Sequence, residues 1–104
     1  MQEIEFASTF DAATSTVTIV GGVYDFRDVE KLDAAIMSAS DDLRSSITLD
    51  LSAAQFFPSL GIGTLVALRR RARAHGTQIR VVAAEGSIAH RVLTVTGVEC
   101  EQPG

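Results

Sequence analysis

The order of strand-like and helix-like segments is the feature that most limits how this chain can fold. Residues Glu3–Ala7 alternate polar and apolar, Thr16–Val20 is β-branched throughout, and helical spacing of apolar residues begins after Asp25. Strand and helix then alternate, which predicts the order β-β-α-β-α-β-α-β. Because parallel strands need crossover connections, this order indicates an α/β fold: a mixed, mostly parallel sheet of four to five strands with helices packed on it.

Local patterns place the other elements. Further strands are predicted at Ile47–Leu51, Gln78–Ala83 and Val98–Glu101, and further helices at about Leu60–His75 and Ser87–Thr96. Loops at the carboxyl ends of the strands form the usual binding edge of such a sheet. Here these loops hold Asp25, the turn Pro58–Gly61 and the turn Glu85–Ser87. We therefore expect these three loops to share one edge.

Composition narrows the class of protein. A chain of 104 residues with 46% apolar residues suits one core, so residues 1–104 are expected to form a single domain. Its net charge of −4 offers no general attraction to nucleic acid or anionic membrane. The apolar stretch Leu60–Leu68 is too short to insert into a bilayer, and no secretory signal is visible, so we expect a cytoplasmic protein. Cys100 is the single cysteine, and no metal or cofactor signature is present.

Ser59 has two interpretations. It precedes a helix rich in Leu, Val and Ala, where a serine hydroxyl commonly accepts a bond from a backbone N–H of the first turn, so capping is favoured on position alone. The same position suits a phosphate, because free N–H groups and the helix dipole stabilise an anion there. Gly61 and Gly63 are not a P-loop, since Thr64 stands where a lysine is required.

Two acids are candidates beside this loop. Asp25 is interpreted either as the N-cap of the first helix or as an acidic wall beside Ser59. Asp50 is expected to fix the turn that follows its strand.

Catalysis finds little support in the sequence. Neither His75, next to Gly76, nor His90, inside a predicted helix, forms a recognisable arrangement with Ser59. We therefore expect no catalytic residues, and an enzyme with Ser59 as nucleophile is a distant alternative.

Arginines cluster at the end of the second predicted helix, at positions 69, 70, 71 and 73. There they complement the negative end of the helix dipole. A solvated helix face is favoured over nucleic-acid binding because the chain as a whole is acidic. Binding of a protein partner by this arginine cluster is the alternative that the sequence leaves open.

The stretch from Leu49 to Gly63 resembles the signature of STAS domains, the anti-sigma factor antagonists of bacteria. Residues Gly22–Asp25 are similar to the family's Gly-Glu-Leu-Asp turn, and His90–Val98 is similar to its third helix and closing glycine. The resemblance covers nearly the whole chain, and the order of elements is the family's order.

This resemblance implies a partner switch. The unmodified domain would bind an anti-sigma factor that is also a serine kinase, and thereby release a sigma factor. Phosphorylation of Ser59, which falls on the family's phosphorylated serine, would break the complex. The residues implied in partner binding are Asp25, Pro58, Ser59, Leu60, Gly61 and Ile62.

The loop departs from the family's pattern at three positions. Pro58 stands where the family has a loop acid, Leu60 follows Ser59, and Val23 replaces a glutamate. Proline supplies neither a carboxylate nor a backbone donor. The alternative is therefore a STAS interaction module that is not phosphorylated and docks on a transporter ATPase or a signalling assembly.

Overall fold

Strands and helices alternate along residues 4–103, the part of the chain that the computed structural model describes. The elements are β1 Ala7–Asp11, β2 Thr16–Gly22, α1 Phe26–Ala39, β3 Ile47–Asp50, β4 Ala54–Phe56, α2 Ser59–Ala74, β5 Ile79–Val82 and α3 Ile88–Thr96. The sheet has the order β1-β2-β3-β5, and β4 pairs with the end of β2. Only β1 is antiparallel to its neighbour. The predicted α/β fold with a mixed, mostly parallel sheet is confirmed.

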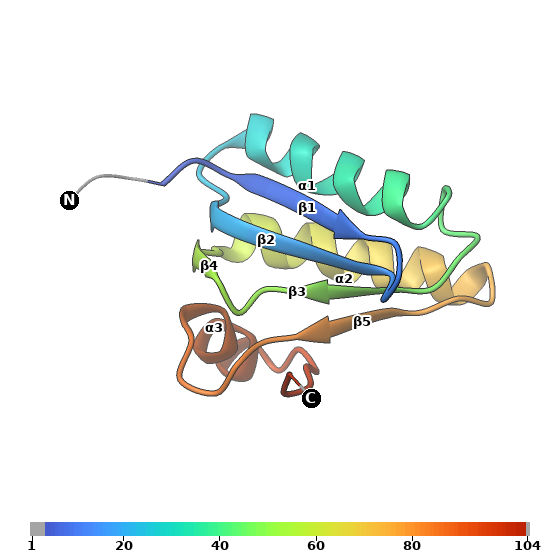
Figure 1. Cartoon of the computed structure of the whole chain (residues 1–104). Coiled ribbons are helices and arrows are strands. Elements are labelled where there is room, and N and C mark those ends of the chain that lie inside the picture. Colours follow the sequence, from blue (N-terminus) through green and yellow to red (C-terminus); the bar gives the residue numbers. More distant parts are fainter. Residues whose placement is uncertain (1–3, 104) are drawn as a thin grey trace.

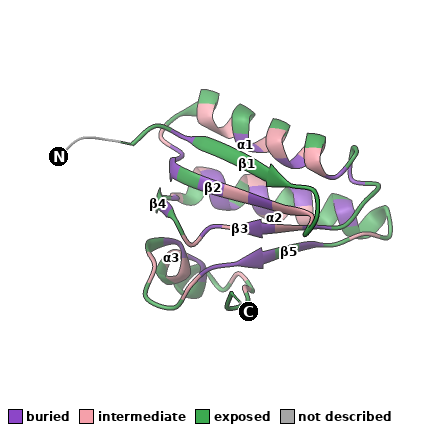
Figure 2. Cartoon of the chain, viewed as in Figure 1, coloured by how far each residue is buried: buried purple, intermediate pink, exposed green. Residues whose placement is uncertain are grey.

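Alternation along the strands separates a core face from an open face. In β2, Val17 and Ile19 are buried whereas Thr16 and Thr18 are only partly covered. Figure 1 shows α1 and α2 running behind the strands, and the buried hydrophobic residues of these two helices belong to the same core cluster as Val17 and Ile19. Figure 2 shows β1 exposed along its length and buried positions in β2, β3 and β5, and no helix covers the face turned to the viewer. The core therefore lies between one face of the sheet and the helices.

The three helices all begin at the end of the sheet where the parallel strands finish, as Figure 1 shows. β2 leads into α1, β4 into α2 and β5 into α3. The loops containing Asp25, Ser59 and Ser87 therefore lie at the same end of the sheet, as the strand and helix order predicts.

The first predicted strand is wrong in its position. The strand lies at Ala7–Asp11, five residues that pair antiparallel with β2 from Ala7↔Val20 to Asp11↔Thr16. The predicted segment began at Glu3, which lies outside the described residues. The hairpin sets the register, because a short turn after Asp11 places the strand directly before it. The alternation that suggested an earlier strand instead serves to bury Phe6.

The element order also differs in detail, since it is β-β-α-β-β-α-β-α. Ala54–Phe56 forms a short strand, β4, within the segment expected to be a loop. The last predicted strand, Val98–Glu101, is reduced to one bridge between Glu101 and Val82. Each segment is only a few residues long and pairs with a single neighbouring strand, so tertiary contacts rather than local pattern decide its state.

Candidate functional site

The loops that enter α1 and α2 leave the sheet side by side. Gly22 of β2 pairs with Phe56 of β4, and the next N–H, that of Val23, donates to the Phe56 carbonyl over 2.9 Å. Figure 1 shows the starts of α1 and α2 at this same end. Residues far apart in the sequence are thereby held on one surface. We call the surface formed by Tyr24, Asp25, Phe26, Phe56, Pro58 and Ser59 the Ser59 edge.

Ser59 is the first residue of α2, and its side chain is exposed. The expectation that Ser59 caps the helix is wrong, because Pro58 occupies the N-cap position with extended backbone. The Pro58 carbonyl accepts the N–H groups of Gly61 and Ile62, but its ring offers no side-chain acceptor. The start of α2 therefore lacks a side-chain cap, and the Ser59 hydroxyl is not used as one.

Asp25 caps α1, which confirms the first of its two interpretations. One carboxylate oxygen accepts the N–H groups of Arg27 at 2.9 Å and Asp28 at 3.1 Å, and the other accepts the Arg27 guanidinium at 3.2 Å. The bond from the Asp28 N–H, together with the Arg27 guanidinium, lowers the pKa of the Asp25 carboxyl below its ordinary value, although partial burial opposes the shift. Asp25 thus stays ionised and fixed at the start of α1.

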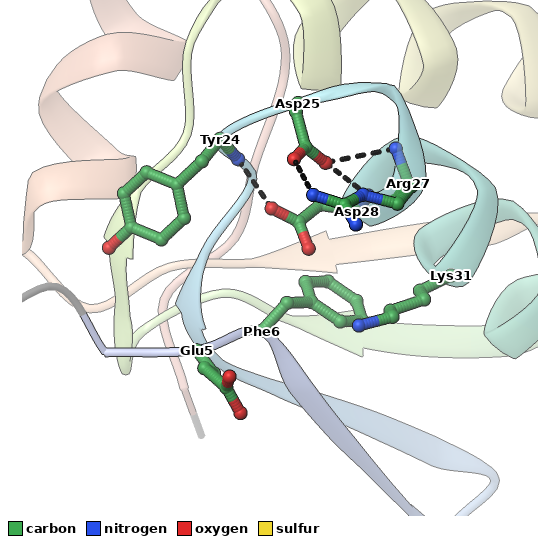
Figure 3. Close-up of a pocket in the computed structure, with 7 residues that line it drawn as sticks. All are labelled: Glu5, Phe6, Tyr24, Asp25, Arg27, Asp28 and Lys31. Carbon is green, nitrogen blue, oxygen red and sulfur yellow. Dashed lines mark hydrogen bonds and ion pairs between the residues drawn. The ribbon is translucent and has the colours of Figure 1, made fainter.

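A groove lies next to this cap, between the N-terminal arm and the start of α1 (Figure 3). Its lining residues are Glu5, Phe6, Tyr24, Asp25, Arg27, Asp28 and Lys31. The Asp28 carboxylate accepts the Tyr24 N–H at 2.8 Å, so it ties the incoming loop to the helix. The groove carries both signs of charge, which suits polar contacts with another protein better than a single anion or cation.

Exposed aromatic side chains form the part of the Ser59 edge that sequence reasoning missed. The rings of Tyr24 and Phe56 stack with centroids 5.3 Å apart, and Phe26 is 74% exposed. A Cβ on Gly22 would lie 2.5 Å from the Tyr24 ring, so only glycine fits beneath this stack. The available signal was compositional: two short stretches, residues 24–26 and 56–57, hold Tyr24, Phe26, Phe56 and Phe57 in a chain with 6% aromatic residues. Exposed aromatics beside a polar groove are typical of protein interfaces.

The other candidate residues of the α2 loop differ in accessibility. Pro58 and Leu60 are partly exposed, whereas Gly61 and Ile62 are buried. A Cβ on Gly61 would lie 3.2 Å from the Phe57 ring, which is itself in the core. Gly61 and Ile62 therefore position the loop from inside, and their part in partner binding stays a prediction.

The remaining polar candidates lie apart from Ser59 or serve local structure. The Asp50 carboxylate accepts the Ser52 N–H at 2.9 Å, which confirms its role in fixing the turn. His75 is the C-cap of α2, at the opposite end of the helix from Ser59. His90 lies within α3, whose N-cap Ser87 accepts the His90 N–H. His75 is therefore too distant to activate the Ser59 hydroxyl.

Two other functional features are absent from the described residues. Across positions 4–103, no group of three or more His, Cys, Asp or Glu side chains could hold a metal ion. Within the same range, none of the helices has the length and apolar character to cross a membrane.

The fold and the site together define an α/β domain with an exposed serine at a helix start and exposed aromatic side chains at the same end of the sheet. Residues 6–100 match the family described as "Mlab, STAS domain". The chain therefore belongs to the STAS domain family, which confirms the resemblance found in the sequence.

Three solved structures of similar fold are described as anti-sigma factor antagonists, one of them as a candidate only. The unphosphorylated form of the antagonist SpoIIAA is 22% identical with a TM-score of 0.63, and the match covers 96% of this chain and 90% of that one. A candidate antagonist from Thermotoga maritima is 15% identical with a TM-score of 0.64, covering 95% and 86%. A STAS domain from Rhodobacter sphaeroides, also an antagonist, is 19% identical with a TM-score of 0.53, covering 81% and 95%. At these identities the likeness establishes the fold.

Proposed function

We propose that this chain is an anti-sigma factor antagonist whose Ser59 edge binds an anti-sigma factor with serine kinase activity. The observation that carries the proposal is the exposure of Ser59 at the start of α2, at the end of the sheet that also carries the exposed rings of Phe26 and Phe56. Aromatic side chains supply much of the binding free energy in protein interfaces. The anti-sigma factor would release its sigma factor when this domain occupies it.

Phosphorylation of Ser59 is proposed as the step that ends binding. A phosphate would add about −1.5 to −2 charges at neutral pH in the middle of the contact surface. At the start of α2 it would also be stabilised by the helix dipole, by about 0.3–1 kcal/mol, because no side chain caps that end. The modified state would therefore persist in the free domain while repelling a partner that packs closely against Phe26 and Phe56.

Two substitutions at Ser59 test the binding surface. We expect Ser59→Glu to weaken binding to the anti-sigma factor by about tenfold or more, measured by isothermal titration calorimetry. Ser59→Ala should bind as the wild type does. Ser45→Glu is the matched control, because Ser45 is also exposed but lies in the loop after α1, at the opposite end of the sheet. Equal binding by Ser59→Glu and wild type would contradict the proposed surface.

Intact-protein mass after incubation with the anti-sigma factor and ATP tests the modification separately. The proposal expects one added phosphate on the wild-type chain and none on Ser59→Ala. An added phosphate that persists in Ser59→Ala would place the modification elsewhere.

Pro58 favours a second candidate function. As the N-cap of α2 it supplies no carboxylate beside Ser59, so a kinase that relies on a loop acid would lack one of its contacts. The second candidate is a STAS module that binds a transporter ATPase or a signalling assembly through the same edge without being phosphorylated. Two results together would favour the second candidate over the phosphorylated antagonist. The mass of the wild-type chain would stay unchanged after kinase treatment, and the Ser59→Glu variant would bind the transporter ATPase more weakly than the wild type does.

A further inference from the structure

The second half of α2 carries four arginines that the Ser59 edge does not use. They are Arg69, Arg70, Arg71 and Arg73. Within residues 4–103 none of them forms an ion pair, whereas Arg27, Arg44 and Arg80 each do. Like charges at this spacing on a helix repel one another. The helix dipole accounts for Arg71 and Arg73, which lie in the last turn, but not for Arg69 and Arg70.

Three of these arginines border a groove between α2 and the segment after α3. Its lining residues are Val66, Arg69, Arg70, Arg73, Gly97, Val98 and Glu99. The Arg69 guanidinium donates to the Glu99 carbonyl at 3.1 Å, which fixes one side of the groove to the other. Arg69 and Arg73 also border an adjoining hollow beside Arg80 and Glu101. Arg71 is exposed and lines neither hollow.

The chemistry of this groove defines what fits it. Partly buried Val66 and Val98 lie among the guanidinium groups, so the groove offers apolar contact together with positive charge. Guanidinium groups bind carboxylates through paired hydrogen bonds. A nucleic-acid backbone fits less well, since Glu99 and Glu101 border the same hollows and the chain has a net charge of −4. We propose that this arginine groove binds an acidic peptide segment of a second protein, in which an apolar side chain is flanked by carboxylates.

The arginine groove is separate from the Ser59 edge. Along α2, Val66 is the groove residue nearest to Ser59, about 10 Å of helix away, and Arg73 lies about 20 Å away at the opposite end. Figure 1 shows the two ends of α2 on opposite sides of the molecule. A partner could therefore occupy one surface while the other is free, and the proposal stands independently of the proposed function.

Fluorescence anisotropy with labelled peptides tests the proposal. The probe is a pool of short peptides in which Glu or Asp flanks a central Leu, compared with a pool that has Gln and Asn instead. We expect the acidic pool to bind more tightly, with an affinity that falls as salt rises. Backbone amide shifts in NMR spectra should change at positions 66–73 and 97–99. Equal binding of the two pools, or shifts confined to the Ser59 edge, would overturn the proposal.

Matched variants sharpen the test. The double substitution Arg69→Gln with Arg73→Gln should weaken binding of the acidic pool by about tenfold, because two guanidinium–carboxylate pairs are lost. Arg71→Gln, on the same helix but outside the groove, should change it little. Glu99→Gln should tighten binding, because it removes a carboxylate that borders the groove. Circular dichroism melts confirm that each variant is folded. If Arg71→Gln lost as much peptide affinity as the double variant, the effect would come from the overall charge, and the assignment of the peptide to the arginine groove would be contradicted.

Three further measurements separate other occupants. A single-stranded oligonucleotide that binds more tightly than the acidic pool at the same salt would assign the groove to nucleic acid. Sedimentation showing a dimer that disappears in the Arg69→Gln/Arg73→Gln variant would assign it to a second copy of the chain. Ser59→Glu should leave peptide binding unchanged, and a loss there would mean that the peptide occupies the Ser59 edge. Tighter oligonucleotide binding, a dimer lost in the double variant, or weaker peptide binding by Ser59→Glu would each overturn the proposal that the arginine groove binds an acidic peptide. None of these results would contradict the proposed function of the Ser59 edge.

Discussion

Asp25 stabilises the start of α1 as an ionised side chain, and this determines how stability should depend on pH. Because bonds from the Asp28 N–H and Arg27 lower its pKa in the folded state, its contribution is fully present above the unfolded-state pKa, about 3.9. The contribution is lost as pH falls through the lower folded-state pKa.

Comparison with Asp25→Asn tests this directly. We expect the wild type to be more stable than Asp25→Asn at neutral pH, because the amide keeps a cap oxygen but loses the charge. The difference in the free energy of unfolding, measured by urea denaturation, should shrink as pH drops below about 4. Other carboxyls titrate in both proteins, so the difference isolates Asp25. A difference that does not vary with pH would contradict the assigned role of the charge.

The role of a single residue could be predicted from the sequence where one local hydrogen bond determines that role. Asp25 and Asp50 both bond N–H groups two residues further along the chain, which their positions indicate. Ser59 was not predictable in the same way. A serine before an apolar helix usually caps it, but here α2 begins one residue earlier, since the fixed φ of Pro58 suits the N-cap position.

At the scale of single elements, the end of α1 contains an unusual backbone segment. Asp41, Asp42 and Leu43 have consecutive φ values of 52°, 55° and 67°, in the left-handed region that favours glycine. Buried Ser40 holds the segment in place, because its hydroxyl donates to the Ile36 carbonyl at 2.7 Å and accepts the Leu43 N–H at 3.0 Å. These local bonds act together with burial of the Leu43 side chain and the bond that the Thr77 hydroxyl donates to the Leu43 carbonyl at 2.8 Å, so local and tertiary contacts both hold a conformation that L residues rarely adopt.

Asp42→Gly should therefore stabilise the protein. Glycine removes the cost of the left-handed conformation but adds flexibility to the unfolded chain, so the expected gain is about 0.5–1 kcal/mol. The urea midpoint measures it, and Asp42 is exposed, so no core contact is lost. Asp42→Val is the opposing control and should be less stable than wild type, since a β-branched residue is strained there. A lower midpoint for Asp42→Gly would contradict this account.

The elements themselves were predictable in proportion to their length. The 14-residue helix α1 and the seven-residue strand β2 have clear periodic patterns. The three-residue strand β4 has none, and it forms because an irregularity between Gly21 and Gly22 lets the end of β2 pair with it. That pairing brings the two loops of the Ser59 edge together.

At the scale of the whole molecule, Phe57 links the Ser59 edge to the core. It is 1% exposed and packs against Gly61 of α2, whereas its neighbour Phe56 points outward and is 45% exposed. One loop thus supplies both a core side chain and a surface side chain. The stability of the fold and the position of Ser59 should therefore depend on each other.

Phe57→Ala should destabilise the protein by about 3–5 kcal/mol, because it leaves a cavity in the core. For a domain of this size each kcal/mol lowers the melting temperature by roughly 4–8 °C. Phe26→Ala makes the same chemical change at a side chain that is 74% exposed, and should leave the melting temperature nearly unchanged while weakening partner binding. Similar melting temperatures for the two variants would contradict the assigned positions of these side chains.

The sequence by itself determined the α/β class, the helices, the turn fixed by Asp50 and the loops that share one edge, and it offered the cap at Asp25 as one of two interpretations. These follow from the spacing of apolar residues and from hydrogen bonds between near neighbours, which act along the chain. Only the tertiary structure decided the register of β1, the pairing of β4, the exposed rings of the Ser59 edge and the arginine groove. Each of these depends on contacts between segments far apart in the sequence, where the free energy of packing outweighs local preference.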